Sequence, residues 1–520
     1  MKNRDMLLAR AALVSILLLV AGLSAQSQSP ESKSGQWRIA GQNLSNTWSQ
    51  PAEHSISPAN VKELKPKWVF TTGGDVSATP TVDGDAVYFP DWAGNLFAVK
   101  KDSGRLIWSH KISDYDGVDG AISRVSPAVD GNQVIIGDIL SSNKVHNGAN
   151  VMAVDRESGT LRWMTHVDDH PAAIVTGSPV VFDGVVYIGV SSSEETLALD
   201  PTYPCCSFRG SIVALDEKTG AMLWKTFDMP DNGGQPGGYS GGAIWQPPAI
   251  DPKRGTLFIG TGNNYTAPAD VEACQNATPT ANCVAADDFF DTAFALDLKT
   301  GQIKWATRLQ GFDTWTVACI RPTGTNPNCP VPTSPDFDLG GSGPNLVGNI
   351  VGFGQKSGIF WALNPDNGNI VWSTPVGPGS SLGGIEWVRR PTVSGFMSLS
   401  GIVTICPTPW WNQRLNTNRV ATLDVGKSVQ YDGAIMMAKT QITLGTEMQR
   451  RARQRANDLG VSLAEYFRRL VARDLARPET ATDVDRIFDL GSSGGSDIAS
   501  QKDSVIAEAF HSTRRKLRRR

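Results

Sequence analysis

The chain has 520 residues and a formal net charge of −3, which is long enough for two or more domains with a large buried core. The small net charge conceals an asymmetry: 17 basic and 11 acidic residues follow Met436, a balance of +6, which leaves −9 for the residues before them. Such an acidic body with a basic tail indicates two pieces with different partners. Beyond the N-terminus no segment approaches transmembrane length, which excludes a multi-spanning helical membrane protein.

Residues 1–25 have the features of a secretory signal peptide. Lys2, Arg4 and Arg10 precede an apolar stretch at residues 11–23, and Ala25 offers a small residue for cleavage. The stretch is too short for a comfortable membrane span. We therefore expect export from a bacterial cell to the periplasm or beyond, with no stable membrane span; an uncleaved anchor helix is the alternative.

One phrase occurs five times between residues 96 and 372. Each copy has an apolar strand, a polar turn that ends in Gly, and a Trp four residues after that Gly. The turn suits a tight hairpin, since Gly adopts positive φ without steric cost. The copies occupy residues 96–108, 151–163, 212–224, 293–305 and 360–372.

A second phrase, roughly Ser/Thr-Pro-x-Val-x-Asp-Gly-x-x-Val-Tyr-Ile-Gly, precedes each copy of the first. It lies at residues 78–90, 126–138, 178–190, 247–260 and, in degenerate form, 343–354. Two hairpin-forming phrases per repeat give four strands, so residues 36–387 are predicted to form an all-β fold, a β-propeller of four-stranded blades. Trp68 lies in an isolated strand that a ring could use to close its last blade. A tandem array of β-sandwiches is the alternative.

The cysteines agree with export to an oxidising compartment. Six of the seven fall into three pairs that are close in sequence, Cys205 with Cys206, Cys274 with Cys283, and Cys319 with Cys329. The last two pairs lie in stretches rich in Pro, Asn and Thr and could staple long loops. The seventh, Cys406, has no obvious partner, and no spacing resembles a zinc site.

Three motifs lie at predicted strand ends: GTGN at 260–263, FDTW at 312–315 and the acidic pair at 194–195. Together they resemble motifs of the pyrroloquinoline quinone (PQQ)-dependent alcohol dehydrogenase family, in particular its polyvinyl alcohol dehydrogenase branch. The run GTGN at 260–263 resembles the calcium-binding motif of that family, which implies that Asn263 is a ligand. The run FDTW at 312–315 resembles the motif of the catalytic aspartate, which implies that Asp313 is the base and a calcium ligand. The acidic pair at 194–195 lies where the family places a calcium-binding Glu; Glu194 is favoured and Glu195 is the alternative. Oxygen ligands of this kind suit Ca²⁺.

Further matches concern the quinone. Trp245 resembles the Trp on which the flat cofactor stacks, and Lys356 resembles the cation that bonds its reactive carbonyl region. Arg209 matches an Arg-Gly pair of the family, and Glu386 lies in a motif near the cofactor where Asn is usual. Cys205–Cys206 resembles a vicinal disulfide that packs on the other cofactor face.

The resemblance implies oxidation of an alcohol, such as polyvinyl alcohol or another secondary alcohol, with PQQ and calcium, and with Asp313 as proton acceptor. No Cys-x-x-Cys-His motif is present, so an external acceptor such as a cytochrome c is expected. Family members close a ring of about eight blades, whereas this chain offers five Trp phrases and Trp68. We therefore expect a truncated propeller that folds poorly or is inactive, since open strand edges favour aggregation. A non-catalytic propeller scaffold is the alternative.

The C-terminal part follows a different pattern. Residues 388–435 lack periodicity and are predicted to be an irregular junction. Residues 436–477 resemble a ribbon-helix-helix domain of the antitoxin type, with a strand at 439–444 and a capping box from Ser462 to Glu465. The resemblance implies a homodimer that places Lys439, Gln441 and Thr443 in the major groove of DNA. A helical hairpin without function is the alternative, and the basic tail 478–520 is expected to be disordered.

Overall fold

A computed structural model describes residues 35–57, 59–140, 148–278, 283–320, 326–330, 336–339, 343–377, 379, 384–386, 390–392, 395–397, 419–424, 452–453, 455 and 466. Contacts within the chain divide it into two compact units, residues 1–437 and 438–520. Among the described residues, no helix has the length and apolarity to cross a membrane.

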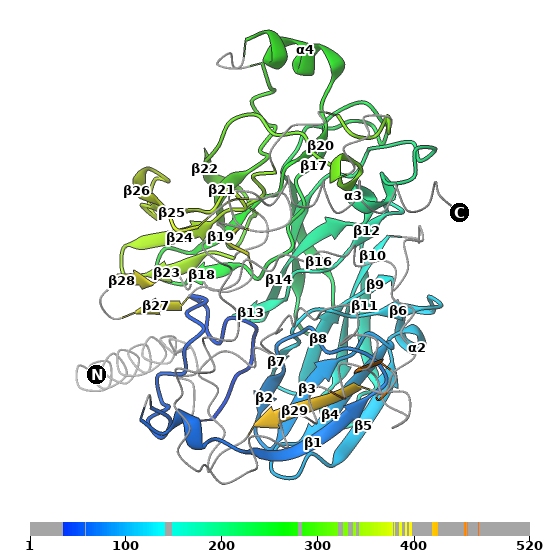
Figure 1. Ribbon diagram of the computed structural model, residues 1–520, viewed down its shortest axis with the longest axis vertical. Helices are drawn as coiled ribbons and strands as arrows, with labels where there is room; N and C mark the ends of the chain where they lie inside the picture. The colour runs from blue at the N-terminus through cyan, green and yellow to red at the C-terminus, as the bar shows by residue number, and fades with distance from the viewer. Residues whose placement is uncertain are drawn as a thin grey trace, which may run out of the picture. The chain divides into compact units, whose positions relative to one another are not determined.

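The first unit contains five antiparallel sheets that are built alike, each with its strands paired in chain order from the inside outward. The strands of the first three sheets are β2 (Thr81–Asp83), β3 (Ala86–Pro90), β4 (Asn95–Lys100) and β5 (Leu106–Lys111); β7 (Ala128–Asp130), β8 (Gln133–Gly137), β10 (Ala149–Asp155) and β11 (Leu161–Asp168); and β13 (Val180–Phe182), β14 (Val185–Ser192), β15 (Ser211–Asp216) and β16 (Met222–Phe227). The other two comprise β18 (Ala249–Asp251), β19 (Thr256–Gly260), β21 (Thr292–Asp297) and β22 (Ile303–Arg308); and β23 (Asn345–Val347), β24 (Ile350–Gly354), β25 (Ile359–Leu363) and β26 (Ile370–Pro375). Figure 1 shows these sheets in succession, from blue to yellow-green.

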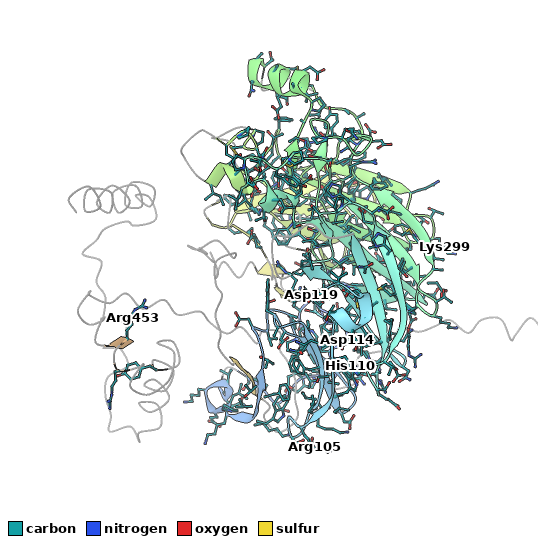
Figure 2. The ribbon with its side chains drawn as sticks, turned by 90° about the vertical axis from the view of Figure 1, so that its right-hand side faces the viewer. Arg105, His110, Asp114, Asp119, Lys299 and Arg453 are labelled. Atoms are coloured by element: carbon teal, nitrogen blue, oxygen red, sulfur yellow. A yellow bond between two sulfur atoms is a disulfide. The ribbon has the colours of Figure 1, made fainter. Side chains whose placement is uncertain are left out.

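Each of the five Trp phrases forms the outer hairpin of one sheet. In the second sheet, Asp155 Oδ1 accepts hydrogen bonds from the backbone N–H groups of Glu157 and Ser158, both at 2.9 Å, which closes the turn. Gly159 completes the turn with a φ of 73°, a value that side chains disfavour. Arg105, which follows the equivalent turn of the first sheet, and Lys299, within that of the fourth, are labelled in Figure 2.

Tryptophan and glycine join consecutive sheets. A Cβ placed on the turn glycine of one sheet would lie 2.5–2.7 Å from Cε3 of the Trp that precedes it along the chain, so the indole packs directly on the glycine backbone. The indole Nε1 also donates to a carbonyl of the same turn at 2.8–3.2 Å. The five pairs are Trp68–Gly104, Trp108–Gly159, Trp163–Gly220, Trp224–Gly301 and Trp305–Gly368. The repeat therefore encodes the contact between blades as well as the blade.

The innermost strands are tied together by the N-terminal segment at residues 37–47. Trp37 forms an isolated bridge with Val82 of β2, and the carbonyls of Arg38, Leu44 and Ser45 accept bonds from β7, β18 and β23. Asn46 Nδ2 donates to the carbonyls of Pro247, Pro248 and Pro344, each at 3.1 Å. This segment has no periodic pattern, and no structural role was predicted for it.

The remaining elements lie at blade edges and in loops. They are β1 (Pro66–Thr72), β6 (Ala121–Ile122), β9 (Ile139–Leu140), β12 (Ala173–Ile174), β17 (Ser240–Gly241), β20 (Asn264–Thr266), β27 (Arg390–Thr392), β28 (Gly395–Met397), β29 (Arg419–Asp424), η1 (Val61–Glu63), η2 (Val317–Ile320), α2 (Ser113–Asp116), α3 (Glu194–Leu197) and α4 (Ala269–Ala277). Strand β1, which carries Trp68, pairs with β29. Strands β27, β28 and β29 lie within residues 388–435, where an irregular junction was expected.

The predicted β-propeller fold is confirmed by these sheets. Buried apolar residues of successive blades form three clusters, the largest of which spans Ile39 to Leu298. The outermost strand of the fifth sheet differs from its equivalents, because all six residues of β26 are exposed. Both predicted loop disulfides are present, Cys274–Cys283 and Cys319–Cys329, together with the vicinal pair Cys205–Cys206.

Candidate functional site

Lys356 lies at the centre of a buried group of charged side chains, in the turn between β24 and β25. Its Nζ is 2.7 Å from Asp336 Oδ2 and 3.1 Å from Asp338 Oδ2, and its residue is 6% exposed. Burial by itself lowers the pKa of Lys356, but the carboxylates of Asp336 and Asp338 raise it well above its ordinary value. Lys356 therefore carries its charge in the interior, as the prediction of a cationic residue requires.

Two tryptophans flank this lysine. The Nζ of Lys356 lies 5.8 Å from the ring centroid of Trp245 and also 5.8 Å from that of Trp315, within the range of cation–π attraction. Trp245 precedes β18, and its Nε1 donates to Asp338 Oδ2 at 3.2 Å. Trp245 and Lys356, which the sequence placed in one site, thus lie together.

Asp313 and Asn263 meet through the backbone of Trp315. Asn263 Nδ2 donates to the Trp315 carbonyl at 2.8 Å, so this amide is oriented by the loop segment that carries Asp313. Asp313 is fully buried, and its Oδ2 accepts a bond from the Phe337 N–H. Burial raises the pKa of Asp313 to about 7, partly opposed by the Phe337 N–H and by the charge of Lys356. A buried carboxyl with such a pKa suits proton transfer near neutral pH.

Three further charged residues, Arg124, Glu195 and Glu386, belong to the same group. We call the whole group the central cluster, and its members are Arg124, Glu195, Trp245, Asn263, Asp291, Asp313, Trp315, Asp336, Asp338, Lys356 and Glu386. Burial lowers the pKa of Arg124 to about 10, while the nearby charge of Glu386 raises it. Burial likewise raises the pKa of Glu195 to about 7, opposed by Lys356 and supported by Asp338 and Glu386. Sequence reasoning missed Arg124, a single Arg in a loop before a repeat phrase, for which no motif was available.

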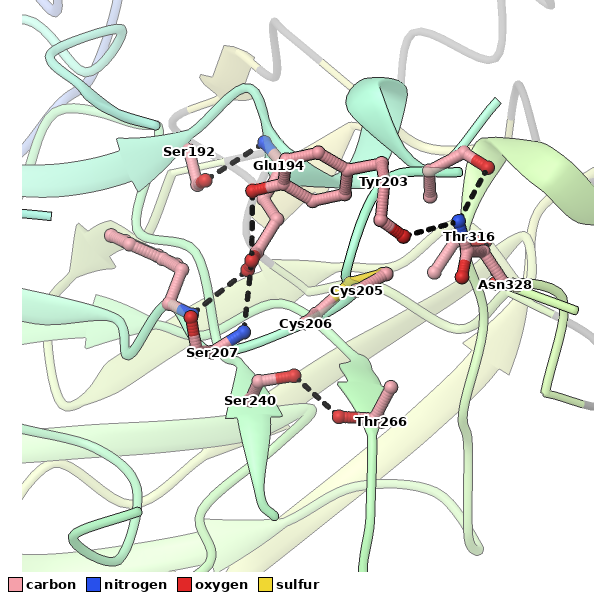
Figure 3. Close-up of a disulfide and its surroundings, with 12 residues drawn as sticks. Ser192, Glu194, Tyr203, Cys205, Cys206, Ser207, Ser240, Thr266, Thr316 and Asn328 are labelled. Atoms are coloured by element: carbon pink, nitrogen blue, oxygen red, sulfur yellow. Dashed lines mark hydrogen bonds between the residues drawn. A yellow bond between two sulfur atoms is a disulfide. The ribbon is translucent and has the colours of Figure 1, made fainter. Parts of the chain in front are cut away.

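Glu194 is engaged elsewhere, beside the vicinal disulfide (Figure 3). Its carboxylate accepts bonds from Tyr203 Oη at 3.1 Å, from Ser207 N at 2.9 Å and from Phe208 N at 2.8 Å. Cys205 and Cys206 lie between these donors in the chain, and Cys206 is completely buried. Of the acidic pair, Glu195 is therefore the one that faces the charges of the central cluster.

Arg209 lies outside the central cluster as judged from its contacts. Its guanidinium donates to the Met229 carbonyl at 2.8 Å, pairs with Asp231 at 3.2 Å and stacks on the Phe227 ring at 4.2 Å. Its predicted role at the cofactor stays a prediction.

Two further predictions remain open in the structure. Within the described part of the chain, no group of three or more His, Cys, Asp or Glu side chains could hold a metal ion. The predicted calcium ligands include an asparagine, Asn263, so the calcium site stays a prediction. Lys439, Gln441 and Thr443 lie outside the described residues.

The chain is similar to several quinoprotein dehydrogenases. A family described as the PQQ-type β-propeller domain of glucose, ethanol and alcohol dehydrogenases matches residues 37–319. A polyvinylalcohol dehydrogenase of a Pseudomonas species is 30% identical over 385 residues, which cover 71% of this chain and 56% of the relative. Its counterpart from Sphingopyxis sp. (strain 113P3) is 32% identical over 348 residues, covering 64% and 49%. A europium-containing methanol dehydrogenase superposes with a TM-score of 0.51 at 17% identity, over 70% of this chain and 68% of that one, which shows the shared fold.

Repeated four-stranded sheets around a buried polar cluster define a β-propeller with a central site. Because the family match covers more than half of the residues, the chain belongs to the PQQ-type β-propeller family of alcohol dehydrogenases. The chain spans about half the length of the curated relatives that it matches.

Proposed function

We propose that this propeller is a quinoprotein oxidoreductase that oxidises an alcohol, polyvinyl alcohol or another secondary alcohol, with PQQ and calcium. The observation that carries the proposal is the buried juxtaposition of Lys356, the Trp245 ring and Asp313 in the central cluster. PQQ is a flat anion, and a buried cation beside an indole face matches its charge and its shape. Bound there, PQQ supplies the oxidising centre, which the side chains of the chain lack.

The residues present fit this cofactor and a hard cation. The half-buried Arg124 and the buried Lys356 are cations that suit its carboxylates, and Trp245 offers a ring for stacking. Asp291 is buried beside Asp313, and burial together with the charge of Asp313 raises the pKa of Asp291 well above its ordinary value, so a cation bound at this pair would favour the ionised carboxylates. Asn263, Asp313 and one acidic residue of the 194–195 pair would hold Ca²⁺. Asp313 accepts the proton of the alcohol, because its raised pKa leaves it a base near neutral pH.

We propose further that the ring of this chain is incomplete and that its own turnover is impaired. Five Trp phrases and the span of about half of each relative support this. The test is a chimera in which residues 36–387 are joined to the C-terminal half of the Pseudomonas relative, assayed for dye-linked oxidation of polyvinyl alcohol with PQQ and Ca²⁺. In saturating PQQ and Ca²⁺, which offset the weaker metal affinity, Asp313→Asn should lower the rate about 10²- to 10⁴-fold while PQQ still quenches tryptophan fluorescence. Asp102→Asn, in an exposed turn, is the control.

A chimera that binds PQQ but oxidises no alcohol would contradict the proposed activity. A soluble monomer of this chain that holds one PQQ and turns over alcohol at the rate of a complete relative would contradict the proposal that the ring is incomplete.

We propose that the electrons pass to an external cytochrome c and that the N-terminal segment directs the chain to the periplasm. N-terminal sequencing of the exported protein tests cleavage after Ala25.

We propose a separate function for the C-terminal unit, DNA binding as a ribbon-helix-helix homodimer. Its support is the division of the chain into compact units after Met437, close to the predicted start of this segment. A salt-dependent shift of DNA by the full chain that is lost when Lys439 is replaced by Ala tests it. If the Lys439→Ala chain still shifts DNA, the predicted strand that carries Lys439 is not the element that contacts DNA.

A further inference from the structure

A second buried polar group lies outside the central cluster. Asp228 follows β16, Asn264 opens β20 and Asp288 precedes β21, and they are 2%, 0% and 0% exposed. Asn264 is next to Asn263 in sequence. Successive side chains of an extended segment point to opposite sides, and accordingly Asn263 Nδ2 donates to Trp315 whereas Asn264 Nδ2 donates to Asp288 Oδ2 at 3.0 Å.

The backbone brings Asp228 to the same place. The Phe289 N–H donates to the Asp228 carbonyl at 2.9 Å, which fixes the loop of Asp288 beside β16. A Cβ on Gly242 would lie 2.5 Å from Asp228 Oδ1, and one on Gly210 would lie 2.5 Å from Oδ2. The Asp228 carboxylate therefore rests against two glycine backbones. The absence of a side chain at both positions leaves room for it.

Four side-chain oxygens of this group have no hydrogen-bond partner among the described residues. They are both carboxylate oxygens of Asp228, Oδ1 of Asp288 and Oδ1 of Asn264. Buried oxygens are almost always satisfied in proteins, by a donor, by water or by a cation. The Asn264 amide is oriented by the bond from its Nδ2 to Asp288 Oδ2, and its Oδ1 is buried next to that bond.

The nearest cations do not satisfy these oxygens. Arg308 donates to the main-chain carbonyl of Asp288 at 2.6 Å and stacks on the Phe290 ring, and Arg209 is bound to Met229 and Asp231. Burial raises the pKa of Asp228 well above its ordinary value, and the charge of Asp288 raises it further, whereas Arg209 lowers it. Two carboxyl groups thus share a buried space without a direct ion pair to either arginine.

We infer that Asp228, Asn264 and Asp288 form a second calcium site, separate from the site proposed for the cofactor. Two carboxylates and an amide oxygen are hard ligands of the kind that Ca²⁺ prefers, with main-chain oxygens or water to complete its shell. The ion would join the end of β16, the start of β20 and the loop before β21. Its role is structural, because it would fix the strand that presents Asn263 to the central cluster.

The test is calcium binding by the full chain without PQQ, after removal of metal by a chelator and titration with CaCl₂. The Asp313→Asn variant isolates the second site, because it weakens the cofactor site and leaves this group intact. We expect about one bound Ca²⁺ per chain in this variant by dialysis and elemental analysis, and a rise in its melting temperature with Ca²⁺. Adding Asp228→Asn should abolish both.

An Asp313→Asn chain that binds no calcium would overturn the inference. So would an Asp228→Asn chain whose melting temperature in saturating Ca²⁺ equals that of the wild type, since protons or water would then satisfy these oxygens. If Asp228→Asn does not fold, Asp288→Asn gives the same comparison. Failure of alcohol oxidation leaves the result unaffected, because no step of the assay uses PQQ.

Discussion

Glu194 and Glu195 are adjacent residues with opposite surroundings, and this difference decides which of them serves the central cluster. Glu194 is held by three donors around the vicinal disulfide. Glu195 shares the electrostatic environment of Lys356 and Asp338. Both residues lie in the first turn of the short helix α3, where successive side chains point in different directions.

The pair therefore gives a matched experiment on the proposed metal site. Glu195→Gln should weaken the calcium affinity that supports PQQ binding by about tenfold or more, since it removes a charge from the ligand set. Glu194→Gln should lower the melting temperature instead, because an amide cannot accept all three bonds as well as a carboxylate. PQQ fluorescence titrations at varied Ca²⁺ and thermal unfolding separate the two. If Glu194→Gln weakens the calcium affinity and Glu195→Gln lowers the melting temperature, Glu194 is the calcium ligand.

Asp138 gives a prediction for the pH dependence of stability. Burial raises its pKa to about 7, opposed by two bonds from Asn150 and supported by the charge of Asp116. The folded state thus keeps a proton that the unfolded chain loses near pH 4, so Asp138 makes the unfolding free energy fall as pH rises from about 4 to about 7. The slope is at most about 1.4 kcal/mol per pH unit.

Urea unfolding at a series of pH values checks this. The Asp138→Asn variant should lose less stability than the wild type between pH 4 and pH 7, whereas Asp102→Asn should follow the wild type. Parallel curves for Asp138→Asn and the wild type would show that Asp138 is ionised throughout this range.

At the scale of elements, the contact between tryptophan and glycine is the main determinant of blade packing. Gly159→Ala should be more destabilising than Gly131→Ala. Both glycines have positive φ, but a Cβ at Gly159 would lie 2.7 Å from Trp108 Cε3, whereas none of the described atoms lies within 4 Å of one at Gly131. We expect about 1 kcal/mol for Gly131→Ala and roughly 1–3 kcal/mol more for Gly159→Ala. Equal losses in urea unfolding would mean that the indole moves aside without cost.

The repeat predicted the five outer hairpins and the contribution of tryptophan to the core, because both follow from local periodicity and turn chemistry. It could not predict that residues 37–47 bond to the innermost strands, since those hydrogen bonds join backbone groups that are 45 to 301 residues apart and leave no pattern in the sequence. The family resemblance implied that Trp245, Asn263, Asp313 and Lys356 belong to one cofactor site. The structure places these residues near one another, and their roles at a cofactor stay predictions. Arg124 was not predicted because its position depends on the tertiary fold alone.

At the scale of the whole molecule, β26 differs from the other outer strands because all six of its residues are exposed. Trp372 is 39% exposed, whereas the equivalent Trp108 and Trp163 are each 8% exposed, and it follows Ile370 and Val371, which are 46% and 54% exposed. An exposed apolar outer strand favours association with other chains. We therefore expect the protein to associate in a concentration-dependent manner through β26.

Val371→Lys tests this expectation, because a charge on an edge strand opposes pairing with another chain. Light scattering across a range of protein concentrations should show less association for this variant than for the wild type. Leu161→Lys is the matched control, since Leu161 is 41% exposed on the outer strand β11, whose Trp163 packs against the next blade. If both lysine variants reduce association equally, the change in net charge explains the reduction, and β26 is not the surface through which the chains associate.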